Sequence, residues 1–221
     1  MEKVNCMRSS CKDVFNAFMV SEAEYAGKYE FPALLPTSKV PNKLITFSKA
    51  LHRDDYNQWI HFYEDDASFE RIWRNPRRYL PILKKFNGVI LPDFSLYRDM
   101  PLAMQIWNIY RSRAIGHWLQ REGVNIIANI RYGDERTYWV CCDGVPKNCV
   151  ISIGTHGTMK NRIDRQYMLQ GLDVVVKRLH PTDIIIYGTA KEKDFQKFLD
   201  LGIRLHRFDS EYAIAHRKEK C

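Results

Sequence analysis

The sequence GVILPDFSLYRDMP, residues 88–101, places a carboxylate directly after an apolar run. Asp93 follows the run from Val89 to Leu91, so it would emerge where a buried strand reaches the surface. In a chain whose formal net charge is +8, a carboxylate there is suited to stabilising positive charge on a bound sugar and to holding a water molecule. A Pro-Asp pair after a strand is also a common turn device, so a purely structural role is the alternative.

Polar and aromatic side chains follow four further apolar runs, within VNIIANIRYG, CVISIGTHG, DIIIYGTA and IRLHRFDS. A histidine could donate a proton to a departing group, an amide could read a base edge, and an aromatic ring could stack on a base. Candidates for such roles, in chain order, are Asp93, Phe94, Tyr97, Asn129, Arg131, Tyr132, Asp134, Thr155, His156, Tyr187, Thr189, His206, Asp209 and Ser210.

The elements that must position these residues alternate between strand and helix. The five runs are too uniformly apolar for strands with one wet face, which predicts a mostly parallel central sheet flanked by helices on both faces. Helices are expected at 102–123, 165–180 and 193–202, with Asp164 capping the second and Gly202 ending the third. Because ligands of open α/β sheets bind beyond the carboxyl ends of the strands, the candidates should meet at one edge.

The region before residue 88 has a different pattern of predicted elements. Residues 1–43 are expected to form an N-terminal extension, with a short helical start and an extended arm, since three prolines interrupt it. Residues 44–221 then form a single α/β domain, starting with strands at 44–51 and 58–65. The next segment, 68–86, predicts a helix kinked or broken at its prolines, and its cations indicate either a solvated face or a phosphate-binding surface.

Composition narrows the class of protein. Of 221 residues, 45% are hydrophobic, which is typical of a soluble globular protein, and the charge of +8 favours a nucleic-acid partner, here DNA. The sequence has no membrane-length apolar stretch and no signal segment, so we expect a cytoplasmic protein, taken to be a monomer, without a membrane partner. The six cysteines lack paired spacing, and nucleotide-binding glycine motifs are absent, so we expect neither a metal nor a cofactor.

Residues 88–216, above all GVILPDFSLYRDMPLAMQIWN, IGTHG and IIIYG, resemble an uncharacterised family found in phages, plasmids and their hosts. The order of elements is also similar to that of the uracil-DNA glycosylase superfamily. That similarity implies a water-orienting Asp and a base-stacking aromatic in VILPDFSLY. It also implies an aromatic-Gly strand end and a His-containing loop within IIIYGTAKEKDFQKFLDLGIRLHRFDS, at Tyr187-Gly188 and His206. The Gln-Asp-Pro-Tyr and His-Pro-Ser motifs of that superfamily are not present.

Together these features predict a DNA glycosylase that flips out a damaged or modified base, with modified phage DNA and antiviral defence as one setting. Asp93 would stabilise the sugar cation and hold the water, and His206 or His156 would protonate the departing base. The expected base-binding residues are Phe94, Tyr97, Asn129, Tyr132 and Tyr187, and the expected phosphate-binding residues are Arg71, Arg74, Arg77, Arg78, Arg98 and Arg131. The alternatives are a non-catalytic nucleic-acid-binding accessory protein of a phage or mobile element and a metal-dependent nuclease, although the sequence has no Asp/Glu-x-Lys triplet.

Overall fold

The computed structural model describes residues 13–159 and 161–218. Its centre is a sheet of seven parallel strands whose spatial order follows the chain. The strands of this sheet are β3 (Leu44–Thr46), β4 (Trp59–His61), β5 (Gly88–Ile90), β6 (Ile126–Asn129), β7 (Val150–Gly154), β8 (Asp183–Tyr187) and β9 (Arg204–Phe208). A short antiparallel pair, β1 (Tyr25–Ala26) and β2 (Phe31–Pro32), precedes it.

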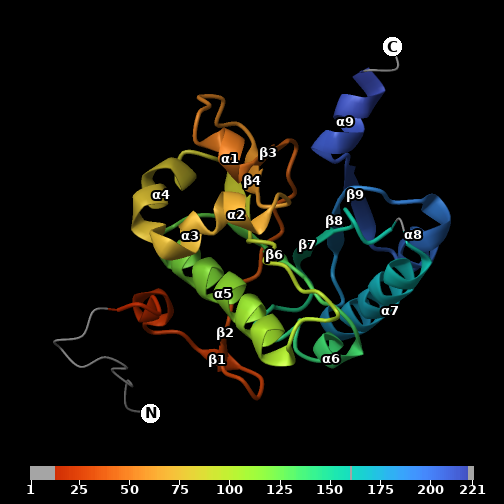
Figure 1. Cartoon of the computed structure of the whole chain (residues 1–221), viewed down its shortest axis with the longest axis horizontal. Helices are drawn as coiled ribbons and strands as arrows, with labels where there is room; N and C mark the ends of the chain where they lie inside the picture. Colours follow the sequence, from red (N-terminus) through yellow and green to blue (C-terminus); the bar gives the residue numbers. More distant parts are fainter. Residues whose placement is uncertain (1–12, 160, 219–221) are drawn as a thin grey trace.

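Helices connect the strands, and the two longest are α5 and α7 (Figure 1). The helices are the 3-10 helix η1 (Ala17–Val20), α1 (Phe47–Ala50), α2 (Asp66–Phe69), α3 (Arg71–Arg74), α4 (Pro76–Leu83), α5 (Leu102–Arg121), α6 (Glu135–Tyr138), α7 (Arg162–Leu179), α8 (Glu192–Asp200) and α9 (Glu211–Lys218). The predicted α/β fold with a parallel sheet is therefore confirmed.

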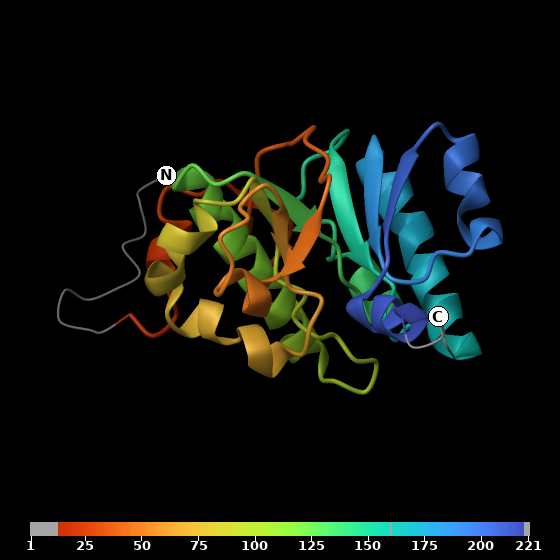
Figure 2. The same ribbon diagram turned by 90° about the horizontal axis from the view of Figure 1, so that it is seen from above.

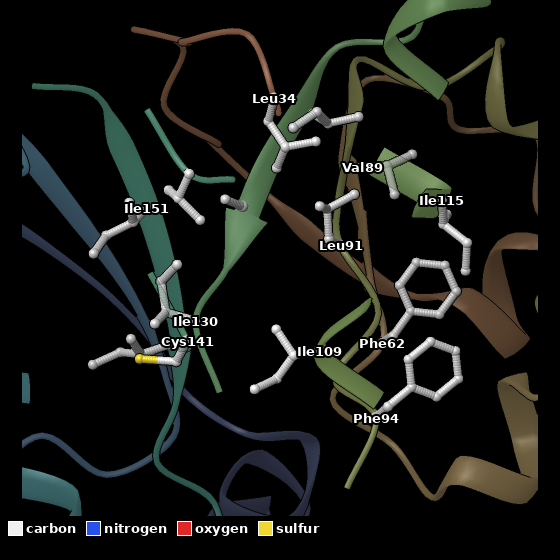
Figure 3. Close-up of a cluster of buried hydrophobic side chains, with 14 of the residues drawn as sticks. Leu34, Phe62, Val89, Leu91, Phe94, Ile109, Ile115, Ile130, Cys141 and Ile151 are labelled. Carbon is white, nitrogen blue, oxygen red and sulfur yellow. The ribbon is translucent and has the colours of Figure 1, made fainter. Parts of the chain in front are cut away.

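The two faces of the sheet have different cores, because successive strand residues point to opposite faces. Val89 and Leu91 join the main core together with helix residues such as Ile109 and Ile115 (Figure 3). Ile90 points the other way, into a small cluster supplied by strands and loops. The members of this cluster are Trp59, Ile90, Ile127, Val150 and Ile185, with Val40, Leu44, Tyr63 and Phe208 packed against them.

The helices that supply core residues thus pack on one face of the sheet, whereas helices were expected on both. The physical reason is the strand order: right-handed crossovers between parallel strands place every helix on the same side when the order never reverses. The small cluster lies on the other face of the sheet. At the carboxyl ends of the strands, the side chains on this face are polar.

Two local expectations had different outcomes. The strand expected at 44–51 ends at Thr46, and a helix follows in which Phe47 and Ala50, three positions apart, are both fully buried. The break expected within 68–86 occurs at Asn75, and Pro76 occupies the first turn of α4, where its missing N–H costs nothing.

The start of α7 also differs from the expectation. The Asn161 side chain, and not Asp164, caps this helix by accepting a hydrogen bond from the Ile163 amide at 2.8 Å. Asp164 is instead bound by Arg98 at 2.7 Å.

The described part of the N-terminal region packs onto the sheet domain. Met19, Phe31 and Leu34 all belong to the main core. The helical start expected in this region corresponds to η1 where it falls on described residues.

Candidate active site

Asp93 follows β5 at the carboxyl edge of the sheet and reaches across to residues of the β6 segment. Its Oδ1 accepts a hydrogen bond from Asn129 Nδ2 at 2.7 Å, and its Oδ2 lies 3.4 Å from Arg131 Nη1. The Asp93 side chain is only 13% exposed. Both carboxylate oxygens therefore face groups from the neighbouring strand, as expected of a functional carboxylate and not of a local turn cap.

A chain of hydrogen bonds extends from Asp93 along the polar face of the sheet. The Tyr63 hydroxyl donates to Asn129 Oδ1 at 2.9 Å and lies 2.6 Å from Ser152 Oγ. Because the Asn129 amide nitrogen donates to Asp93, its oxygen is free to accept from Tyr63. The donors in this chain consequently point toward the carboxylate, which favours its charged form.

The Tyr63 ring is held by its packing. It stacks on Tyr187 with 4.8 Å between ring centroids and 11° between planes. On another side it meets Gly154 at the end of β7, where a Cβ would come within 2.8 Å of the ring. A glycine at this position is thus what allows the ring to approach β7.

The electrostatics at Asp93 are a balance of opposing effects. Burial raises the pKa of the Asp93 carboxyl above its usual value, while Arg131 and the hydrogen bond from Asn129 limit that rise; Asp66 on α2 adds a small repulsion. Burial also raises the pKa of Tyr63 well above its usual value, so its hydroxyl remains a neutral donor at neutral pH. A carboxylate with a raised pKa is the kind of group that active sites use.

A cavity of about 360 Å³ lies beside Asp93. Arg131 and Gly154, which both adjoin the carboxylate, form part of its wall. The other lining residues are Leu96, Tyr97, Arg98, Ile130, Tyr132, Gly133, Ile153, His156, Gly157, Thr158, Asp164, Tyr167 and Met168. Its size is within the range of small-molecule sites, and its walls combine aromatic rings with a few charged groups.

Several predicted residues do line this cavity. Tyr97 is largely exposed at 58%, and His156 is also exposed. Arg98 lies over the Tyr167 ring at 5.0 Å while it pairs with Asp164. These residues and Arg131 surround the same space, as the sheet-edge rule predicts.

Other residues expected to bind a base are occupied elsewhere. Phe94 is 1% exposed and packs in the main core, where Arg111 lies 3.8 Å from the centre of its ring (Figure 3). Asn129 uses both ends of its amide within the protein. The Tyr187 side chain is buried between Tyr63 and His61, so it supports the site without facing the cavity.

Tyr132 lines the cavity, and its ring and hydroxyl contact α7. Its hydroxyl donates to the Met168 carbonyl at 2.7 Å, and its ring occupies the space left by Gly171. Tyr132 therefore forms a fixed wall of the cavity.

His206 is not part of this assembly. It lies inside β9 and not after it, and its Nε2 is 2.8 Å from Asp183 Oδ1. Asp183 is the first residue of β8, at the amino edge of the parallel sheet, and Asp93 is at the carboxyl edge. The sequence pattern located the strand correctly but not its carboxyl end.

The expected phosphate-binding run at 71–78 is also distant from the cavity. Its residues belong to α3 and α4, which Figures 1 and 2 show on the opposite side of the molecule from α7. Arg71 lies over the Phe47 ring at 5.3 Å, whereas Arg74, Arg77 and Arg78 are exposed. Of the predicted phosphate-binding residues, Arg98 and Arg131 alone line the cavity.

Sequence reasoning missed Tyr63, Ser152 and Gly154. The sequence does contain a signal for them, because each lies near the carboxyl end of an otherwise apolar run. Each also falls on the same face of the sheet as Asn129. Tyr63 was read only as a strand aromatic.

Within residues 13–159 and 161–218, no group of three or more His, Cys, Asp or Glu side chains is placed to hold a metal ion. Nor does any helix in that part of the chain have the length and apolarity to cross a membrane. Cys141, Cys142 and Cys149 are free and buried; Cys6, Cys11 and Cys221 lie outside the described residues.

Comparison with known proteins supports the first resemblance noted in the sequence. The chain is 35% identical over 185 residues to the Gene 1 protein of Mycobacterium phage L5, covering 82% of this chain and 80% of the phage protein. It is 33% identical over 185 residues to the Gene 1 protein of Mycobacterium phage D29, covering 82% of this chain and 68% of that one. No solved structure matches, and the similarity to uracil-DNA glycosylases receives no support from these comparisons. Residues 23–209 match the domain of unknown function DUF4417, and the chain belongs to that family.

Proposed function

We propose that the chain is a DNA glycosylase that hydrolyses the N-glycosidic bond of a damaged or modified base held in the cavity. The observation that supports this most strongly is Asp93, held across the sheet by Asn129 and by Arg131, which itself lines a neighbouring cavity with tyrosine rings. A flipped base needs an enclosed space with aromatic walls, and a sugar cation needs a fixed carboxylate.

In this proposal the bond between C1′ and the base nitrogen breaks, and positive charge develops on the sugar. The ionised Asp93 stabilises that charge and accepts a proton from the water that adds to C1′. The base leaves with the bonding electron pair and takes a proton from His156, which lines the cavity. Tyr97 stacks on the base, and Arg98 holds a neighbouring phosphate.

The test uses plain, uracil-containing and hypermodified phage DNA, each incubated with the protein in EDTA and then treated with hot alkali to cut at abasic sites. We expect alkali-dependent breaks on at least one modified substrate. The Asp93→Asn variant should lower their rate about 100-fold or more, because the amide cannot stabilise the sugar cation. Asp99→Asn is the matched control, since Asp99 is an exposed carboxylate of the same loop.

Each other outcome identifies an alternative. Breaks that require magnesium and persist in Asp93→Asn would indicate a metal-dependent nuclease. Mobility shifts without abasic sites on every substrate would indicate a non-catalytic nucleic-acid-binding protein.

A further inference from the structure

A second surface, which shares no lining residue with the cavity, exposes several aromatic rings. Phe15, Tyr29 and Trp107 are 67%, 43% and 39% exposed. They border two adjoining grooves formed by α5 and the N-terminal segment, and both grooves share Phe15, Tyr29 and Tyr110. Exposed rings gathered in this way are unusual on a protein surface without a binding role.

The central ring of this surface is held in a fixed orientation. Trp107 stacks on Tyr110 with 5.4 Å between centroids and 17° between planes, and it packs edge-on against Trp73 at 5.5 Å. Trp73 is nearly buried and anchors the pair to the main core. A ring supported on two sides loses little conformational entropy when a ligand stacks on it.

Three cations adjoin these grooves. Arg74, Arg77 and Arg78 line a neighbouring hollow, and Arg77 lies 4.2 Å from the centre of the Phe18 ring. Asn16 joins the two regions, because its side-chain amide donates to the Trp73 carbonyl at 2.7 Å. The arginines and the aromatic grooves thus form one continuous face.

The charge of this hollow is not neutralised within the described residues. None of the three arginines forms an ion pair with another residue of 13–159 or 161–218. Both oxygens of the adjacent Glu70 carboxylate accept from Arg111 at 2.8 Å. Asp13, which accepts hydrogen bonds from the backbone amides of Phe15 and Phe18, is the one carboxylate among the described residues that line this hollow, against three arginines.

We infer that this face binds single-stranded nucleic acid. Bases would stack on Trp107 and on the neighbouring exposed rings, and Arg74, Arg77 and Arg78 would hold the phosphates. Uncompensated cations beside the grooves favour a polyanion over an apolar protein segment, and rings can stack on bases only where the bases are not already stacked in a duplex. The inference does not depend on the glycosylase proposal, because none of the residues that line this face lines the cavity, and α4 lies on the opposite side of the molecule from α7 (Figures 1 and 2).

The test is fluorescence anisotropy with labelled oligothymidine of about 15 nucleotides, the upper range of a single-strand site. The Asp93→Asn protein is used, so that the measurement is independent of catalysis. Trp107→Ala should weaken binding about 10-fold or more through the loss of stacking, whereas Trp107→Phe, which keeps a ring, should retain most of the affinity.

The charge contribution is tested separately. The double variant Arg77→Glu, Arg78→Glu should weaken binding at least about 10-fold and reduce the slope of log affinity against log salt by about 1.4, the contribution of two phosphate contacts on a single strand. Arg53→Glu, Arg207→Glu is the matched control: both arginines are exposed and the change in net charge is the same, but they lie on other parts of the surface.

Three results would overturn the inference. The first is unchanged oligothymidine affinity in both Trp107→Ala and Arg77→Glu, Arg78→Glu. The second is duplex DNA that binds as tightly as the single strand and is insensitive to Trp107→Ala. The third is a dimer, detected by light scattering, that Trp107→Ala dissociates, because this face would then be an interface between copies of the chain.

Discussion

Asp93 owes its properties to two side chains that its own strand does not supply. Asn129 binds one carboxylate oxygen and Arg131 lies beside the other, and both favour the charged form against the effect of burial. Tyr63 in turn fixes the orientation of the Asn129 amide, since it donates to the amide oxygen. Tyr63 is therefore a positioning residue whose effect on Asp93 passes through Asn129.

At this scale we predict that Tyr63→Phe raises the pKa of Asp93. Without the hydroxyl, Asn129 Oδ1 loses its donor, and the amide can turn away from the carboxylate. The variant should also lose about 1–3 kcal/mol of unfolding free energy, because the buried Asn129 Oδ1 is left without its donor. The measurement is a carboxyl ¹³C NMR titration, with the Asp93 signal assigned from its loss in Asp93→Asn.

The control for this experiment is Tyr187→Phe. It removes a hydroxyl that accepts a hydrogen bond from the Glu211 amide and is not part of the chain leading to Asp93. An Asp93 titration that is the same in Tyr63→Phe and in the wild type would contradict the positioning role.

At the scale of elements, the site is assembled from the ends of four neighbouring strands. β4 leads to Tyr63, β5 to Asp93, β6 ends on Asn129, and β7 carries Ser152. The parallel register brings these positions to one edge, since the carboxyl ends of adjacent strands lie together. The close approach of β4 and β7 side chains across β5 and β6 requires Gly154, which leaves room for the Tyr63 ring.

We therefore expect Gly154→Ala to displace Tyr63 and to destabilise the protein by about 1–3 kcal/mol, the usual cost of overpacking. Thermal or denaturant unfolding measures this loss. In a Tyr63→Leu background, where the ring is absent, the cost of Gly154→Ala should be much smaller. Equal costs in the two backgrounds would show that the clash is with another group.

At the scale of the whole molecule, two chemically different surfaces occupy different parts of the protein. The cavity beside Asp93 is lined in part by residues of α7, whereas α3 and α4, which carry the exposed arginines, lie on the opposite side of the molecule from α7 (Figure 1). A ligand that fills the cavity cannot be held at the same time by the α4 arginines unless it passes around the molecule. The net charge of +8 is thus not concentrated around one site.

We expect the pH dependence of the free energy of unfolding to include a contribution from His61. This histidine is buried between Tyr63 and Tyr187, and its Nδ1 accepts from the Tyr63 amide. Burial lowers the pKa of His61 to about 3, with a smaller contribution from Lys49. Between that value and the ordinary 6.5, the unfolded chain binds a proton that the folded chain does not, so stability falls as the pH is lowered through this window.

The expected slope from this one group is about 1.4 kcal/mol of unfolding free energy per pH unit. His61→Gln should remove it, and urea unfolding between about pH 4 and pH 6, within that window, would measure the difference. His52→Gln is the control, since His52 is exposed. A pH dependence that His61→Gln leaves unchanged would show that His61 is not the group responsible.

The family and the parallel α/β fold could be predicted from the sequence because they depend on local features. Uniform apolar runs separated by amphipathic segments determine the strands and helices, and Pro76 determines a break, whatever the rest of the chain does. Asp93 was identifiable for the same reason, as a polar residue directly after such a run.

The tertiary structure alone decided which of the candidates come together. Phe94 follows Asp93 directly, yet its side chain packs in the main core, because the chain has left β5 here and strand alternation no longer decides which way a side chain points. His206 and the α4 arginines are not part of the candidate site, because their strand and helix place them away from the cavity. Tyr63 belongs to the site through a ring contact with Tyr187, which lies 124 positions away in the chain. Contacts between residues so distant in the chain depend on strand order and register, which no local pattern in a single sequence encodes.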